Sequence, residues 1–313
     1  MTTSTSRERA DIEPSVRRVA EVVAEAPRHS MMTDAVEIVR ELWHYRELLQ
    51  QLTRRDIKIR YKQAVMGFGW AIFMPAMVVL AGLVVKYVMA QFSGRPLEMQ
   101  SIASVVVKSL PWAFFVGAIG FATSSMIGNK NLVAKIYFPR EVFPLSSTLA
   151  QTFDSSIGAA ALVLALPFLG VRFSVELLWV PLLLALLFLF TVAMGLLLSC
   201  GNLFFRDVKY LVSVFLTFGI FFTPVFFEPD VLGTLGSQLI MLNPLAPIFE
   251  GIRLSVVEQH NLLIPLSGTS AAGASVTIWN PWYLVYSGTL ATVGLVVSSL
   301  LFHRLEFLYA EYI

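Results

Sequence analysis

Residues 110–147 read LPWAFFVGAIGFATSSMIGNKNLVAKIYFPREVFPLSS. Their first part is apolar up to Gly128, and a second apolar run begins near Phe143. Between the two runs lie three basic residues and a proline. A helix needs about 20 mostly apolar residues to cross about 30 Å of hydrocarbon. The stretch therefore predicts the end of one membrane span, a short segment outside the membrane, and the start of the next span.

The whole chain has the composition of an integral membrane protein. Of its 313 residues, 56% are hydrophobic and 14% are charged, whereas soluble domains are about 45–50% apolar and about 25% charged. Because lipid offers the backbone no hydrogen bonds, we expect the spans to be helices. The sequence predicts an all-α fold in which residues 64–313 form the transmembrane domain. The six predicted spans cover residues 65–92, 101–127, 143–169, 177–203, 208–227 and 282–302.

The basic residues predict the orientation, since cytoplasmic loops carry an excess of Lys and Arg. With a cytoplasmic N-terminus, the outer loops hold only Arg95, Arg172 and Arg253 of the 23 basic residues. Lys86 and Lys108 fall in the outer parts of the first two spans, where their long side chains are expected to reach the interface. The opening residues lack the apolar core of a signal peptide. We therefore expect a multi-pass protein of the cytoplasmic (inner) membrane with both termini in the cytoplasm.

Two regions are predicted before the first span. Residues 1–32 are polar and are expected to be a disordered cytoplasmic extension. In residues 33–63, Val36, Val39 and Trp43 recur at helical spacing among charges. This pattern predicts an amphipathic interface helix that lies along the membrane surface.

A basic segment closes this arm. Thr53 and Asp56 are spaced like a capping box, which predicts that a new helix begins at Thr53. The cations of this segment anchor the chain on the cytoplasmic side. They are also suited to bind the phosphates of a lipid head group, because Arg offers a forked donor and Lys a point charge. The two interpretations are compatible. The cations are Arg54, Arg55, Lys58, Arg60 and Lys62.

The outer segment from Glu228 to Pro281 contains two apolar pieces, each about half a span long. Pieces of 10–14 apolar residues suit re-entrant or interfacial helices, and such a pair could form an exit gate. The stretch SGTSAAGAS at 267–275 is typical of a flexible surface loop. The residues expected at the outer gate are Asn243, Pro244, Phe249 and Arg253.

Several kinds of chemistry are not expected of this chain. The dipeptide Gly-Lys is absent, so the chain lacks a P-loop and is not expected to hydrolyse ATP. Its four histidines are scattered, and no metal site is predicted. The single cysteine, Cys200, is expected to be a small buried hydrophobic residue.

Asp154 is the one acid predicted near the middle of a span. Burying a carboxyl there is costly, so it suggests a function. Thr152, Ser155 and Ser156 lie beside it and could satisfy it by hydrogen bonds. A structural role and a role in the transport path or gating both remain open. An ion-coupled carrier is disfavoured, since it needs several such groups.

Aromatic residues crowd the spans. Each could simply pack or face lipid. Together they could line a conduit, because ring faces suit the C–H faces of sugars. The expected transport path comprises Trp70, Phe73, Trp112, Phe115, Asp154, Phe218 and Phe222.

The loop inside the opening stretch carries an apolar face. On a helix, Leu132, Val133, Ile136 and Tyr137 share one side, and Pro139 ends the run. A loop in water has no reason to gather these side chains unless they pack on the membrane subunit or dock in a partner's groove. Since the chain has no P-loop, we interpret this segment as the contact through which another protein's ATP hydrolysis acts.

The chain resembles the transmembrane subunit of ABC-2 type polysaccharide exporters. The resemblance covers roughly residues 36–313 and is carried by the opening stretch, RRDIKIRYKQAVMGFGWAIFMP at 54–75, RDVKYLVSVFLTFGIFFTPVFF at 206–227 and LNPLAPIFEGIR at 242–253. It implies a homodimer of six-span subunits bound to two copies of a cytoplasmic ATPase. It also implies a coupling helix between spans two and three, an interface helix before span one and outer gate helices between spans five and six. The coupling residues would be Asn129, Lys130, Leu132, Val133, Lys135, Ile136, Tyr137, Arg140 and Glu141.

The expected function is a permease subunit, itself no enzyme, that moves a lipid-linked, O-antigen-like polysaccharide across the inner membrane. No cofactor is expected in this chain, since ATP and Mg would be bound by the ATPase subunit. The expected partners are the membrane, the lipid-linked glycan and the ATPase. Binding of nucleic acid is not expected. The alternatives are an exporter of teichoic acid, an exporter of small hydrophobic drugs or peptides, and a membrane-embedded transferase. The extension before residue 33 and an apparent insertion at 262–278 depart from the family pattern.

Overall fold

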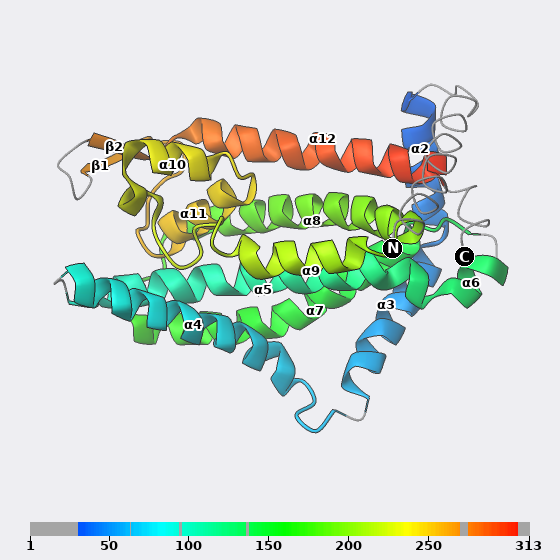
Figure 1. Ribbon diagram of the computed structural model, residues 1–313, viewed down its shortest axis with the longest axis horizontal. Helices are drawn as coiled ribbons and strands as arrows, with labels where there is room; N and C mark the ends of the chain where they lie inside the picture. The colour runs from blue at the N-terminus through cyan, green and yellow to red at the C-terminus, as the bar shows by residue number, and fades with distance from the viewer. Residues whose placement is uncertain (1–30, 63, 94–95, 136–137, 270–274, 306–313) are drawn as a thin grey trace, which may run out of the picture.

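A computed structural model describes residues 31–62, 64–93, 96–135, 138–269 and 275–305. The predicted disordered extension lies outside them apart from its last two residues. The described chain is a bundle of long, roughly aligned helices with short elements gathered at both ends (Figure 1). The long helices are α4 (Gly69–Ser93), α5 (Met99–Gly128), α7 (Val142–Ala165), α8 (Trp179–Phe204) and α12 (Pro281–Leu305).

Five segments of the described chain are long and apolar enough to cross a membrane. Two of them are extended by short 3-10 helices, η1 (Leu166–Leu169) and η2 (Val175–Leu178). They correspond to five of the six predicted spans, and they confirm the prediction of a multi-pass helical protein. Their bounds are Gly69–Phe92, Met99–Gly128, Val142–Leu169, Val175–Phe204 and Pro281–Leu305.

The fifth predicted span differs from the structure. Helix α9 (Val208–Gly219) has only 12 residues, and residues 220–227 form turns and bends. Pro224 explains part of this difference, because proline has no N–H and its ring blocks a continuing helix. The prediction of one uninterrupted helix over 208–227 is therefore wrong.

Three short helices gather at one end of the bundle, which we call the inner end: α2 (Met31–His44), α3 (Arg46–Tyr61) and α6 (Lys130–Lys135) (Figure 1). The predicted interface region is divided at Tyr45, where α2 ends and α3 begins. The predicted helix start at Thr53 is wrong. Thr53 lies inside α3, and its hydroxyl donates to the carbonyl of Leu49 instead of capping a new turn.

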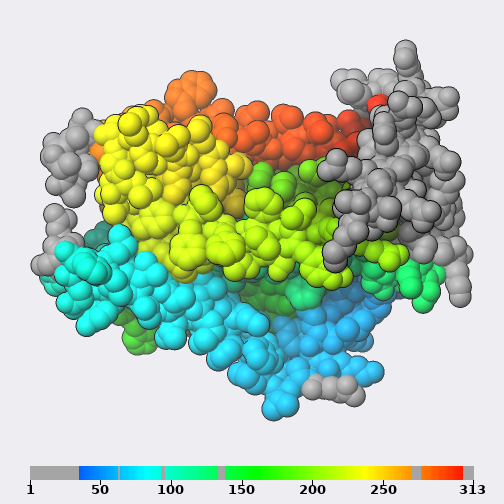
Figure 2. All heavy atoms as spheres, in the orientation of Figure 1, coloured from blue at the N-terminus to red at the C-terminus, as the bar shows by residue number. Residues whose placement is uncertain are grey.

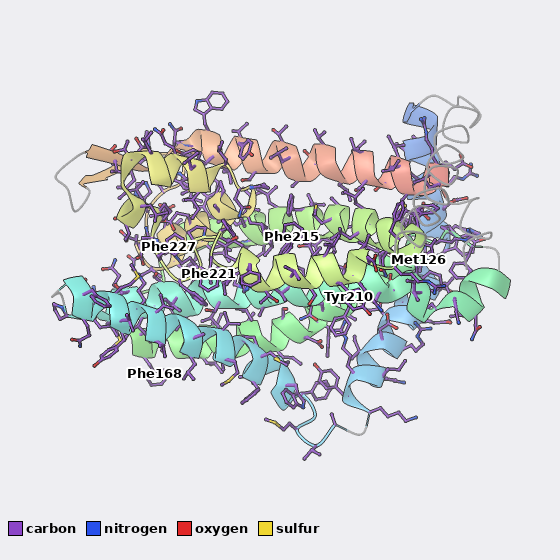
Figure 3. All side chains as sticks on the ribbon, viewed as in Figure 1. Met126, Phe168, Tyr210, Phe215, Phe221 and Phe227 are labelled. Carbon is purple, nitrogen blue, oxygen red and sulfur yellow. The ribbon has the colours of Figure 1, made fainter. Side chains whose placement is uncertain are left out.

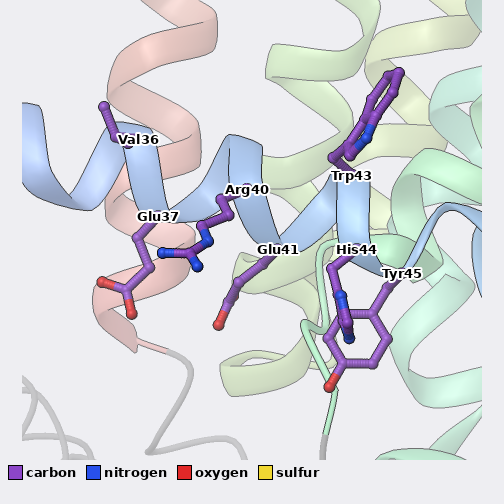
Figure 4. A pocket seen from close by; sticks show the side chains of 7 residues that line it. All are labelled: Val36, Glu37, Arg40, Glu41, Trp43, His44 and Tyr45. Carbon is purple, nitrogen blue, oxygen red and sulfur yellow. The ribbon is translucent and has the colours of Figure 1, made fainter.

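Helix α2 is amphipathic, as predicted. Ile38 is buried against the bundle, whereas Val36, Val39 and Trp43 form an exposed stripe. An open hollow of about 910 Å³ lies over this helix. In Figure 4, Val36 and Trp43 point away from the side that carries Glu37. An exposed apolar stripe beside a charged side suits a helix on a membrane surface.

The core of the bundle is built around α5, which packs against α4, α7, α8, α9 and α11 (Leu245–Val256). Small and hydroxyl-bearing residues let these helices approach. Between α5 and α8, Asn202 Nδ2 donates to the carbonyl of Thr123 at 2.9 Å. Cys200 is buried in the apolar cluster at the inner end, as predicted. Close packing and interhelical hydrogen bonds of this kind hold helices together in lipid.

Helix α4 lies at the edge of the bundle, where it forms the lower border in Figure 2 while α9 covers the front. Most of its large side chains are exposed. It packs closely on α5 at Gly82, where an added Cβ would lie 2.5 Å from Val105 Cγ1 and 2.7 Å from Phe226 Cδ1. A glycine is therefore required for this approach.

The substitution Gly82→Leu is expected to destabilise the folded protein by about 1–3 kcal/mol, because the larger side chain must separate α4 from α5. Gly120→Leu on α5 is the matched control, since nothing lies within 4 Å of its added Cβ. Thermal unfolding in detergent measures both. Equal losses of stability in the two variants would contradict the close approach of α4 to α5 at Gly82.

The opposite, outer end carries η3 (Pro229–Leu232), α10 (Gly233–Met241), α11 and a hairpin of β1 (Leu266–Thr269) and β2 (Ser275–Trp279) (Figure 1). The two strands contradict the all-α prediction and the prediction of a loop over 267–275, of which residues 270–274 lie outside the described chain. Trp279 fixes the hairpin, because its ring is buried and its Nε1 donates to the carbonyl of Leu262 at 2.8 Å.

Candidate functional site

At the inner end, the last turn of α3 is bound to the middle of α7. Arg60 Nη1 donates to Asp154 Oδ2 at 2.5 Å and to Gln151 Oε1 at 2.8 Å. The hydroxyl of Tyr61 donates to Asp154 Oδ1 at 2.7 Å. The Arg60 guanidinium also lies 3.7 Å from the ring centre of Phe121, a favourable cation–π contact. We call Arg60, Tyr61, Gln151 and Asp154 the α3–α7 clamp.

The clamp corrects the predicted environment of Asp154. The hydroxyl of Thr152 donates to the carbonyl of Thr148, and that of Ser156 donates to the carbonyl of Phe153. Asp154 is thus satisfied by an ion pair with Arg60 rather than by its neighbours along the chain. Burial and the hydrogen bond to Asp154 raise the pKa of Tyr61 above its usual range, so the phenol remains a donor.

A cavity of about 630 Å³ lies beside the clamp, between α4, α5 and α7. Its polar corner is formed by the clamp, and its walls include Trp70 and Trp112. Three members of the predicted transport path, Trp70, Trp112 and Asp154, therefore meet around one cavity.

The other predicted path residues lie elsewhere. Phe115 is buried in the core and stacks on Phe190 with ring centres 6.3 Å apart. Phe73 is exposed on α4, and Phe218 is exposed on α9, as is Phe222 just beyond it. Figure 3 labels two further aromatic residues of this segment, Phe215 on α9 and Phe221 just beyond it.

A second groove, of about 450 Å³, lies between α5 and α9 on the other side of Trp112. Trp112 and Val116 line both spaces. The groove combines apolar walls with one cation at its inner end and a row of hydroxyls. Sequence reasoning missed it, although serines and threonines that recur on α5 and α9 give a signal. These polar groups are Lys209, Thr123, Ser124, Ser213 and Thr217.

The outer end holds a second buried polar cluster. Lys86 forms an ion pair with Glu228, and the hydroxyl of Ser104 donates to the other Glu228 oxygen at 2.7 Å. Lys108 is fully buried and donates to the carbonyl of Phe227 at 2.9 Å. The expectation that both lysines reach the interface is therefore wrong. They tie α4 and α5 to the segment that precedes η3.

The predicted gate residues lie within this outer region. Asn243 separates α10 from α11, and its Nδ2 donates to the carbonyl of Phe222 at 2.9 Å. The carbonyl of Pro244 accepts from Ser287 on α12. The ring centre of Phe249 lies 6.2 Å from that of Trp112, so the predicted gate contacts the aromatic residue shared by both cavities.

Arg253 is buried on α11. It donates to Glu250 Oε1 through Nε at 2.8 Å and through Nη2 at 2.6 Å, and its Nη1 donates to Glu258 at 2.6 Å. Glu250 is fully buried, whereas the side chain of Glu258 is 34% exposed. One arginine thus holds two carboxylates in different surroundings.

Comparison with known proteins shows to which family the chain belongs. Residues 47–257 match the family described as ABC-2 type transporter, from α3 to the end of α11. The chain belongs to the ABC-2 type transporter family.

Two relatives of this ABC-2 chain share one name. The O-antigen export system permease protein RfbA of Klebsiella pneumoniae is 29% identical over 201 residues, which cover 64% of this chain and 76% of the relative. The protein of that name from Myxococcus xanthus is 28% identical over 257 residues, which cover 78% of this chain and 93% of the relative.

The predicted coupling segment of the ABC-2 chain lies at the inner end, where α6 projects beyond the long helices (Figure 1). Asn129 Nδ2 bonds back to the carbonyl of Ser125 at 2.8 Å. Lys130 is exposed, and Leu132 packs on the apolar cluster beneath it. Arg140 is half-buried, and the buried Glu141 lies 3.3 Å from His303. The side chains of Val133, Lys135, Ile136 and Tyr137 lie outside the described residues.

The five predicted head-group cations separate into two sets. Arg60 turns inward to the clamp. Arg55 pairs with Asp56 at 2.8 Å. Arg54, Lys58 and Lys62 are exposed. The four cations other than Arg60 line an open hollow of about 820 Å³ that also includes Phe68.

Proposed function

We propose that this ABC-2 chain is the permease subunit of an ATP-driven exporter of a lipid-linked polysaccharide, with an O-antigen-like glycan as its substrate. The two relatives named O-antigen export system permease favour this class. The observation that carries the proposal is the pair of spaces flanking Trp112, one bordered by aromatic rings and one by a row of hydroxyls. Aromatic faces and hydroxyls together suit sugars of varied structure.

The proposed assembly contains two copies of the chain in the inner membrane and two copies of an ATPase subunit that binds ATP and Mg. Each chain contributes six spans, with α9 and residues 220–227 together forming the fifth. Both termini lie in the cytoplasm. In support of this orientation, the described N-terminal helix α2 packs against α12, the last described helix. The segment around α6 is the coupling contact, and α10 with α11 forms the outer gate.

Loss of the gene is the direct test of this function. Cells that lack the chain are expected to accumulate the lipid-linked glycan on the cytoplasmic side and to lose it from the surface. Mass spectrometry of the extracted lipid identifies the stalled product. A teichoic-acid carrier would be recognised by a stalled polyol phosphate. Normal surface glycan, together with ATPase stimulation by small amphiphiles, would instead favour a drug or peptide exporter.

The basic hollow on α3 is proposed to bind the diphosphate of the lipid carrier, since exposed Arg and Lys bind phosphate oxygens by charge-assisted hydrogen bonds. The double variant Arg54→Gln with Lys58→Gln is expected to reduce export about tenfold or more, the equivalent of about 1.4 kcal/mol of lost binding. Surface glycan is measured at equal protein level.

Arg46→Gln is the matched control, because Arg46 is an exposed cation at the start of the same helix and lies over Trp43. Its export is expected to stay within about twofold of wild type, since exposed charges away from the ligand contribute little. Equal losses of export in the double variant and in the control would show that the charges act only by anchoring the helix.

A further inference from the structure

The α3–α7 clamp joins two segments that the chain separates widely. Arg60 and Asp154 are 94 residues apart, and both oxygens of the carboxylate accept a hydrogen bond from α3. A buried ion pair adds little net stability over apolar packing. Its directional bonds do, however, fix the register and rotation of one helix on another. The clamp therefore couples α3 rigidly to α7.

The same face of α7 also holds the beginning of α4. Gly158 follows Asp154 by four residues, so the two positions lie one above the other on the helix. An added Cβ at Gly158 would lie 2.7 Å from Leu110 Cδ1 and 3.3 Å from the carbonyl oxygen of Ala71. Helix α7 thus contacts the end of α3 and the start of α4, the two helices joined by the connection around residues 62–68.

Helix α7 is also the element that directly follows the coupling segment. Only six residues separate Lys135, the end of α6, from Val142, the start of α7. Val142 and Phe143 are buried in the inner apolar cluster, so the beginning of α7 is firmly packed. A displacement of α6 must therefore act on α7 at short range.

We propose that Arg60, Tyr61 and Asp154 are positioning residues that transmit the displacement of α6, through α7, to α3 and the start of α4. Helix α4 forms one wall of the cavity of about 630 Å³. Farther along, it packs closely on α5 at Gly82 and is tied to Glu228 by the ion pair of Lys86. Movement of its inner half changes the width of this cavity. The inference rests on the proposed function, in which a partner ATPase moves α6.

The first test separates coupling from folding. Asp154→Asn keeps the size of the side chain but removes the charge that holds Arg60. The complex purified with its ATPase subunit is expected to keep ATP hydrolysis within twofold of wild type, while export of the glycan falls at least tenfold. Ser156→Ala, an exposed position on the same helix, is the control and is expected to change neither quantity.

The exchange of charges gives the second test. Arg60→Asp and Asp154→Arg are each expected to abolish export, and the double variant is expected to recover at least a tenth of wild-type export. A general loss of folding would reduce protein level and ATP hydrolysis together and would not be rescued. If the double variant is no better than the single variants at equal protein level, the clamp does not transmit movement.

A third measurement does not depend on the glycan. Spin labels at Val65→Cys and Phe205→Cys, in a Cys200→Ser background, report the position of the start of α4 relative to α8. Labels at Lys130→Cys and Phe205→Cys report α6. ATP is expected to shift both distances in the wild type, whereas Asp154→Asn keeps the α6 shift and loses the α4 shift. An α4 shift that survives in Asp154→Asn would overturn the inference. Failure of glycan export in the wild type with normal shifts would instead refute only the proposed function.

Discussion

Arg253→Met is expected to lower the free energy of unfolding by about 3–5 kcal/mol, the usual effect of removing one partner from a buried ion pair. Arg253 is the donor for both bonds to the fully buried Glu250. Without it, the carboxylate loses its compensating charge inside α11. Unfolding in mixed detergent micelles, followed by helical circular dichroism, measures the loss.

Glu258→Gln is the matched control, because Glu258 contacts the same arginine from a partly exposed position. Its expected loss is within about 1 kcal/mol, as for ion pairs near the surface. The double variant Arg253→Met with Glu250→Gln should recover part of the stability, since neither charge of this buried pair remains. Equal losses for Arg253→Met and Glu258→Gln would contradict the buried pair as the cause.

Glu228→Gln is expected to remove an acid-induced loss of stability. Burial alone raises the pKa of Glu228, but the positive charges of Lys108 and Lys86 outweigh it and lower the pKa from 4.5 to about 2. A lowered carboxyl pKa stabilises the folded state fully above the ordinary value, and this contribution is lost as the pH falls toward the lowered value. The difference corresponds to roughly 3 kcal/mol, at about 1.4 kcal/mol for each pKa unit.

The wild type should therefore be less stable at pH 3 than at pH 6, whereas Glu228→Gln should show a much smaller difference and a lower stability at pH 6. Denaturation midpoints across this pH range test the expectation. Glu98→Gln serves as control, since Glu98 is exposed at the start of α5 and its removal should keep the acid dependence of the wild type. A wild type whose stability is independent of pH would refute the role of Glu228.

The long helices could be predicted from the sequence because their signal is local. A run of about 20 apolar residues has few alternatives to a span. The two short apolar pieces expected in the outer segment likewise appear as α10 and α11. The partners of Asp154 could not be predicted in this way. They lie 93 and 94 residues before it in the chain, and nothing in the intervening sequence indicates which face of α7 meets α3.

The outer end shows a different reason for failure. Composition around residues 267–275 favours a loop, but Val276, Thr277 and Ile278 are residues typical of strands. The buried Trp279 decides between the two, because it supplies the packing that a short hairpin needs. The sequence also failed to indicate the partners of Lys86 and Lys108, which were expected to reach the membrane interface. Their acceptors, Glu228 and the carbonyl of Phe227, come from a segment far along the chain.

Under the proposed function, the early end of α9 shortens the distance over which a sugar chain must give up water. Twelve helical residues extend for about 18 Å, against about 30 Å of hydrocarbon. Beyond Gly219, two backbone carbonyls have partners within the protein, because Asn243 and Lys108 donate to the carbonyls of Phe222 and Phe227. We therefore expect the outer end of the groove between α5 and α9 to admit water without loss of the fold. Each hydroxyl of a passing glycan would be dehydrated over little more than half the thickness of the membrane.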